Sequence, residues 1–85
     1  SISAAVNACR DADYSVWIEV ECETLDEVHE ALQVCPDIIL LDIMSAAAVC
    51  AARADIPESI LLEASGNITL ENVREYAVTG VNRIA

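Results

Sequence analysis

Short apolar segments alternate with helical segments along the chain, and this alternation limits the fold more than any other feature of the sequence. Residues 16–22 alternate with the period of two that a strand requires, whereas Ile38–Leu41 and Ile60–Leu62 are continuous apolar runs, typical of strands buried on both faces. Residues 81–85 begin a fourth strand. Because helices separate the strands, we expect right-handed crossovers and a parallel sheet. The fold class is therefore α/β, a partial TIM-like barrel of four parallel strands alternating with four helices.

Apolar spacing predicts the first helix, and capping residues predict where the second and third begin. Residues 2–9 have apolar positions at helical spacing, and the capping box that begins at Thr24 precedes a second helix over about 25–34. Ser45 is expected to cap an alanine-rich third helix that ends near Arg53.

The fourth helix is expected to begin at Thr69, its capping residue, and to stop at Gly80, which can adopt the left-handed conformation common at helix ends. Helical spacing predicts an inner side made of Leu70, Val73 and Ala77.

Apolar residues make up 55% of the 85 residues, which exceeds the roughly 45–50% of a usual soluble domain. A chain this short buries a low fraction of its surface, so this content is high for a domain that must cover its own outside. No apolar run approaches the ~18 residues of a membrane helix, and no membrane partner is expected. We therefore expect residues 1–85 to be a partial barrel domain, incomplete at both ends.

The charge balance argues against a nucleic-acid partner. The chain has 15 acidic residues and 4 arginines, with no lysine, for a net charge of −11. Affinity for nucleic acid comes largely from cations that face phosphates, and this chain offers few. A phosphorylated small molecule remains possible, because backbone N–H groups and guanidinium groups also bind phosphate.

The four cysteines, Cys9, Cys22, Cys35 and Cys50, form no C-x-x-C pair, and no histidine lies at zinc-ligand spacing. We interpret them as buried, reduced thiols that act as small apolar residues. Reduced thiols are typical of the cytoplasm, where disulfides are rare.

Acidic residues recur at the carboxyl ends of the predicted strands. Glu21, Asp42 and Glu63 are 21 residues apart, and strand alternation predicts that all three point to the inside of the barrel. Active sites of parallel barrels lie at this end. Carboxylates there accept hydrogen bonds from sugar hydroxyls and bind hard cations such as Mg²⁺. The alternative is that they are ordinary solvated acids, since strand ends are exposed.

The segment Ala64–Thr69 follows a strand and opens a helix, a position where free N–H groups favour an anion. Ser65, Gly66 and Asn67 are therefore candidates to bind a phosphate. The alternative is an ordinary connection, because any strand-to-helix turn favours small and capping residues.

Three blocks carry a family resemblance: Ile18–Cys22, Asp37–Asp42 and Leu62–Val81, in this order and spacing, closely resemble the quinolinate phosphoribosyltransferases. These pentosyltransferases are also called carboxylating nicotinate-nucleotide pyrophosphorylases. The resemblance implies transfer of a phosphoribosyl group from phosphoribosyl pyrophosphate to quinolinate, with Mg²⁺ and loss of CO₂. The products would be nicotinate mononucleotide and pyrophosphate, in NAD biosynthesis.

The resemblance also implies roles for individual residues. Glu21 and Asp42 match acids that take part in catalysis and hold the ribose hydroxyls and the metal-bound substrate, and Asp42 is the implied metal-binding residue. Ser65, Gly66 and Asn67 match the turn that takes the 5′-phosphate, while Glu63 matches a further acid of the substrate site.

One residue departs from the family pattern, because Ile43 stands where the family usually has asparagine after the aspartate. The lysines, histidine and arginines of the family that hold quinolinate and pyrophosphate have no counterparts in this sequence, so the 85 residues alone are expected to be inactive. We expect the parent enzyme to be cytoplasmic and a homodimer or larger homo-oligomer. The alternatives are a non-catalytic piece that self-associates through open sheet edges, or a same-fold relative acting on another phosphorylated ligand.

Overall fold

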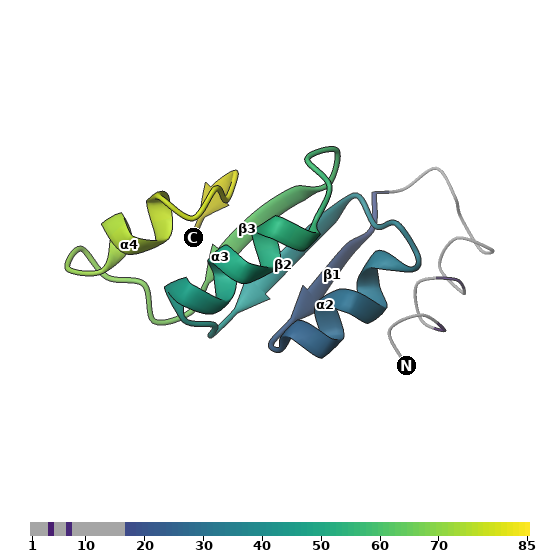
Figure 1. The fold of residues 1–85 in the computed structure, drawn as a ribbon, viewed down its shortest axis with the longest axis horizontal. Coiled ribbons are helices and arrows are strands. Elements are labelled where there is room, and N and C mark those ends of the chain that lie inside the picture. The colour runs from purple at the N-terminus through teal and green to yellow at the C-terminus, as the bar shows by residue number, and fades with distance from the viewer. Residues whose placement is uncertain (1–3, 5–6, 8–16) are drawn as a thin grey trace.

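A computed structural model describes Ala4, Asn7 and residues 17–85 of the chain. Four parallel strands form one sheet in the order β1-β2-β3-β4, so each strand pairs with its predecessor in sequence (Figure 1). The strands are β1 (Glu19–Cys22), β2 (Ile38–Asp42), β3 (Leu61–Ser65) and β4 (Arg83–Ile84), and the helices are α2 (Leu25–Leu32), α3 (Ala46–Asp55) and α4 (Val73–Ala77). The predicted α/β fold with parallel strands is confirmed. Ala4 and Asn7 are helical, and the rest of the predicted first helix lies outside the described residues.

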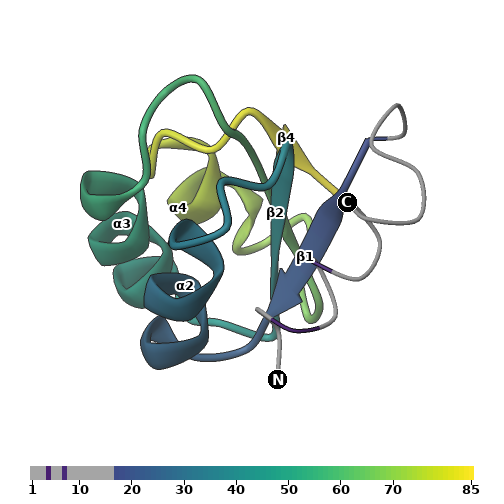
Figure 2. The same ribbon diagram turned by 90° about the vertical axis from the view of Figure 1, so that its right-hand side faces the viewer.

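The helices α2, α3 and α4 all lie on one face of the sheet (Figure 2). Strand side chains on that face are buried, and each large apolar side chain removed from water stabilises the fold by about 1.5–3 kcal/mol. This core includes Val20, Cys22, Ile39, Leu41, Leu62 and Ala64. We call the opposite side the open face; its strand positions are Glu19, Glu21, Ile38, Leu40, Asp42, Leu61, Glu63, Ser65 and Arg83. No described helix lies over it.

Two side chains fix the strands at their amino ends. The backbone N–H of Asp37 donates to the carbonyl of Ile18 at 3.0 Å, and the N–H of Ile18 donates to the Asp37 carboxylate at 2.8 Å. Asn82 repeats this pattern with Leu62, since its N–H donates to the Leu62 carbonyl and its side-chain oxygen accepts from the Leu62 N–H, both at 2.8 Å. Each pair of bonds sets the register of one strand against the strand before it.

The predicted caps of α2 and α3 are present. The Thr24 hydroxyl accepts from the N–H of Glu27, the Glu27 carboxylate accepts from the N–H of Glu23, and Ser45 accepts from the N–H of Ala48. These bonds satisfy backbone donors that a helix start leaves without partners. None of the described helices has the length and apolar character needed to cross a membrane.

The start of α4 differs from the prediction. The N–H of Thr69 donates to the Asn72 side chain at 2.7 Å, and the N–H of Asn72 donates to the Thr69 hydroxyl at 3.3 Å. These reciprocal bonds close a turn, and the helix begins only at Val73. Thr69 therefore organises the turn that precedes the helix.

The late start of α4 also changes which residues face the core. Leu70 is 97% exposed and Ala77 is exposed, so the prediction that they line the inner side was wrong. Tyr76 is buried instead, and its hydroxyl donates to the carbonyl of Met44 at 2.7 Å. This hydrogen bond joins α4 to the connection between β2 and α3.

The cysteines only partly follow the prediction. Cys22 is fully buried, and burial raises the pKa of its thiol to about 11. Cys35 and Cys50 are exposed, so the expectation of burial was wrong for both. Cys35 follows the end of α2 in a left-handed conformation, and Cys50 lies on the outer side of α3. Cys9 lies outside the described residues.

The two environments of leucine give a matched test of this core. We expect Leu62→Ala to lower the free energy of unfolding by about 2–5 kcal/mol, because the side chain is fully buried. Leu70→Ala is expected to change it by less than about 0.5 kcal/mol. Urea denaturation followed by circular dichroism measures both. Equal losses in the two variants would contradict the exposure of Leu70.

Candidate functional site

The strand register arranges the open-face side chains in rows across the sheet. Glu21, Leu40, Glu63 and Arg83 occupy successive positions in one row, one from each strand. The next row toward the carboxyl ends contains Asp42 opposite Ser65, and this pair joins the acidic repeat to the turn that follows β3. The acids of the 21-residue repeat therefore lie on the same face, at the same end of the sheet.

Glu21 and Asp42 interact directly across β1 and β2. A hydrogen bond with Asp42, followed by the repulsion of its charge, raises the pKa of Glu21 above its ordinary value, and the nearby Glu23 and Glu19 add to the effect. A raised pKa means that the two groups resist being ionised together. A cation, or hydroxyl groups that donate to both, would remove this repulsion.

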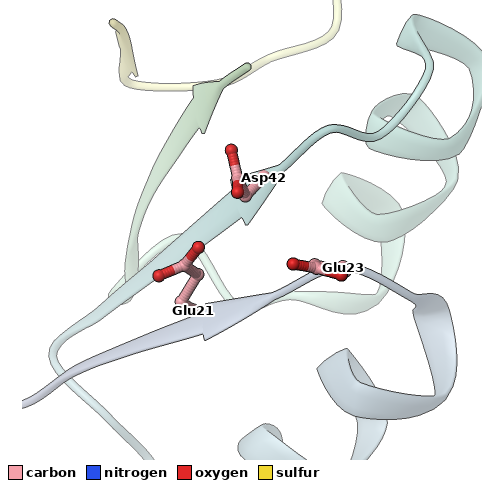
Figure 3. A group of neighbouring side chains, drawn as sticks. All are labelled: Glu21, Glu23 and Asp42. Carbon is pink, nitrogen blue, oxygen red and sulfur yellow. The ribbon is translucent and has the colours of Figure 1, made fainter.

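Glu23 is a third member of this acidic group, and sequence reasoning missed it. One oxygen from each of Glu21, Glu23 and Asp42 lies within 4.8 Å of the others. Figure 3 shows these side chains near the carboxyl ends of β1 and β2. Side-chain alternation could have identified it, because Glu23 lies two residues after Glu21 and so points to the same side of the sheet.

Asp42 is also in contact with the turn that follows β3. The Ser65 hydroxyl donates to Asp42 Oδ1 at 3.1 Å, and the N–H of Ile43 donates to the Ser65 carbonyl at 3.0 Å. A Cβ atom added to Gly66 would lie 2.7 Å from Asp42 Oδ1, and the φ of Gly66 is +84°. Only glycine allows the turn to approach the aspartate this closely.

The turn that follows β3 also contains consecutive backbone donors. The backbone N–H groups of Gly66, Asn67 and Ile68 donate to no acceptor among the described residues. Gly66 and Asn67 both have positive φ, and the side-chain amide of Asn72 donates to the Asn67 carbonyl at 2.9 Å. Consecutive N–H groups in such a turn form a concave site that suits an anion.

Glu63 has a different partner from the other two acids of the repeat. Its Oε1 atom lies 3.5 Å from Nε of Arg83, the residue directly opposite on β4. The Glu63 side chain is 20% exposed and the Arg83 side chain is 53% exposed. The open face therefore has an acidic half over β1 and β2, and a charge-paired half over β3 and β4.

Ile43 has a strained backbone beside this site. Its φ is +55°, a left-handed value that β-branched residues rarely adopt, and its side chain is 61% exposed. Its Cγ1 and N atoms would each lie 2.8 Å from a Cβ on Gly66. An apolar side chain therefore lies against the phosphate-turn candidate, where the family resemblance led us to expect asparagine.

A cavity of about 620 Å³ lies away from these residues. It is formed at the amino ends of β3 and β4, and none of the candidate site residues lines it. Its lining is Arg53, Ala54, Ile56, Pro57, Glu58, Gly80 and Asn82. The cavity is therefore separate from the acids and the turn at the carboxyl ends of the strands.

Ile43→Asn is expected to stabilise the protein by about 1 kcal/mol, because asparagine tolerates the left-handed conformation better than a β-branched residue. Ile43→Val keeps the branch at Cβ and is the control, with no gain expected. Thermal denaturation measures both variants. A gain in the valine variant as large as that in the asparagine variant would show that backbone strain is not its source.

Glu21→Gln is expected to raise the melting temperature at pH 7 in the absence of divalent cations. The pKa of Glu21 is raised above 4.5 in the folded protein, so the carboxyl group ionises more readily in the unfolded chain. Folding stability is therefore lost as the pH rises above 4.5. The difference from the wild type should therefore shrink as the pH falls toward 4. Glu75→Gln, on the exposed side of α4, controls for the loss of one charge. A destabilised Glu21→Gln at pH 7 would contradict the repulsion.

Comparison with known proteins identifies relatives along the whole chain. A family model described as quinolinate phosphoribosyl transferase, C-terminal domain, matches residues 1–85. A probable carboxylating nicotinate-nucleotide pyrophosphorylase of Synechocystis sp. is 40% identical over 89 residues, covering 100% of this chain and 30% of that protein. The probable enzyme of the same name from Bacillus subtilis is 37% identical over 84 residues, covering 99% of this chain and 29% of that protein.

A solved structure agrees with these relatives. The crystal structure of nicotinate-nucleotide pyrophosphorylase from Ehrlichia chaffeensis matches with a TM-score of 0.94 and 36% identity, covering 99% of this chain and 31% of that chain. The present chain thus spans about 30% of the length of the curated relative from Synechocystis. By its sequence and its fold, the chain belongs to the quinolinate phosphoribosyltransferase C-terminal domain family.

Proposed function

We propose that this chain is part of the catalytic barrel of a longer enzyme, incomplete at both ends, that transfers a phosphoribosyl group to quinolinate. The share of its relatives that it covers, between 29% and 31%, supports this proposal. The reaction would convert quinolinate and phosphoribosyl pyrophosphate to nicotinate mononucleotide, pyrophosphate and CO₂. The 85 residues alone would be inactive, because an isolated set of four strands cannot enclose both substrates.

One contact carries the proposal. Ser65 donates to Asp42, so the carboxylate pair of Asp42 and Glu21 is adjacent to the turn whose N–H groups donate to no described acceptor. A ribose 5-phosphate group needs this combination, because its hydroxyls donate to carboxylates while its phosphate accepts from N–H groups. Ser65, Gly66 and Asn67 are therefore proposed to bind the 5′-phosphate, and Glu21 and Asp42 to bind the ribose. Glu63 completes the proposed substrate-binding set.

The same carboxylates would stabilise the reaction itself. Positive charge develops on the ribose carbon as pyrophosphate departs, and fixed negative groups nearby lower the energy of that state. Glu21 and Asp42 are proposed as the catalytic residues because they supply this charge. Their mutual repulsion falls when positive charge develops beside them.

The residues also suit Mg²⁺, which favours oxygen ligands and retains several waters. Asp42, with Glu21 and Glu23 beside it, would hold the ion through carboxylate oxygens, some of them through water. Bound there, Mg²⁺ would neutralise negative charge on the phosphates of the substrate. The proposed enzyme would be cytoplasmic and a homodimer or larger homo-oligomer, as expected from the family resemblance.

In the full-length protein, Asp42→Asn and Glu21→Gln are each expected to lower kcat/KM about 10²–10³-fold, because each removes fixed charge from the site. Glu58→Gln is the control, since this exposed acid lies at the amino ends of the strands. Formation of nicotinate mononucleotide from quinolinate and phosphoribosyl pyrophosphate is the measurement. Unchanged turnover in both site variants would reject the assignment.

A further inference from the structure

Arg83 is the guanidinium group on the open face among the described residues. The other described arginines lie elsewhere: Arg53 donates to the carbonyls of Ile56 and Pro57 at 2.7 and 3.0 Å, and Arg74 is exposed on α4. Arg83 belongs to the row that contains Glu21 and Glu63, one position below the row of Asp42 and Ser65. It therefore lies next to the candidate site, on β4, the strand that follows the turn of Ser65, Gly66 and Asn67 in the sequence.

The ion pair with Glu63 involves only one of the three guanidinium nitrogens of Arg83. The pair joins Nε to Oε1 at 3.5 Å, and the guanidinium donates no hydrogen bond to any other described residue. Half-exposed pairs of this kind add little stability, about 0–1 kcal/mol. Arginine has five N–H donors in a planar fork, so its outer nitrogens remain available to a second anionic partner.

The acidic charge of the open face would be unfavourable for an anionic substrate, and a cation on this face would reduce that repulsion. Five acids share this side, and among the described residues Arg83 is the one cation near them: the acids are Glu19, Glu21, Glu23, Asp42 and Glu63. A phosphate or carboxylate that approaches this face is repelled by the acids, and the guanidinium of Arg83 lowers that repulsion near β3 and β4.

We propose that Arg83 binds an anionic oxygen group of the substrate and that Glu63 positions its guanidinium for this contact. The inference rests on the proposed function, because it concerns the same site and its substrates. The role of Glu63 would then differ from that of Glu21 and Asp42, because Glu63 would contribute to substrate binding through Arg83. Two sources of the anion share this chemistry: the phosphate groups of phosphoribosyl pyrophosphate and the carboxylates of quinolinate.

Steady-state kinetics of the full-length enzyme tests the proposal. Arg83→Gln is expected to raise KM at least tenfold for one substrate, which identifies the source of the anion, and to change kcat and the KM of the other substrate less than threefold. Arg83→Lys is expected to recover part of the loss because it keeps the charge. Glu63→Gln should raise the same KM by a smaller factor. Arg74→Gln, an exposed arginine of α4, is the matched control.

Unchanged KM values in Arg83→Gln would overturn the proposal. A parallel loss for both substrates, together with a lower melting temperature and no recovery by lysine, would also overturn it, because it indicates a purely structural ion pair. Calorimetric binding of inorganic pyrophosphate and of quinolinate to wild type and Arg83→Gln needs no turnover. An Arg83-dependent affinity for either probe would therefore support the anion site even if the wild type made no nicotinate mononucleotide.

Discussion

The pairing of β2 with β3 is the constraint on which the site depends. Their parallel register sets Asp42 opposite Ser65, and the hydroxyl of Ser65 then donates to the aspartate. A slip of one residue would turn each strand's side chains to the other face, placing Asp42 under the helices and Leu41 on the open face. Burial of Ile39, Leu41 and Leu62 opposes that slip, so the apolar core fixes the position of the polar groups.

The site combines groups that an isolated fold would avoid. Glu21 and Asp42 repel each other, Ile43 has a left-handed backbone, and Gly66 occupies a position too narrow for any side chain. Each feature opposes stability, and all three lie at the carboxyl ends of the neighbouring strands β1, β2 and β3. Such a concentration is common where a protein holds groups ready for a ligand, because the rest of the fold supplies the stability.

The sequence predicted the parts of the fold that depend on apolar patterning. The runs at Ile38–Leu41 and Ile60–Leu62 identified the buried strands, and side-chain alternation placed the acids of the repeat on one face. It failed where local hydrogen bonds decide the outcome. The reciprocal bonds of Thr69 and Asn72 delay α4, and so Tyr76 replaces Leu70 on the inner side.

Long-range pairs were equally out of reach of sequence patterns. The contact between Glu63 and Arg83 joins residues 20 positions apart, and it depends on the register of β3 and β4. Glu23 was missed for a different reason. It lies one residue beyond the end of β1, and the predicted alternation covered only residues 16–22. Strand patterns therefore locate a face more reliably than they locate every group on it.

The paired bonds of Asp37 and Asn82 have a consequence for how this architecture tolerates change. Each residue ties the start of its strand to the preceding strand, and so registration is decided before the chain reaches Asp42 on β2 and Arg83 on β4. A helix of different length, or a longer loop, can be accommodated between two such anchors without displacing the strands. Changes in the helices and loops would therefore leave the geometry at the carboxyl ends of the strands intact.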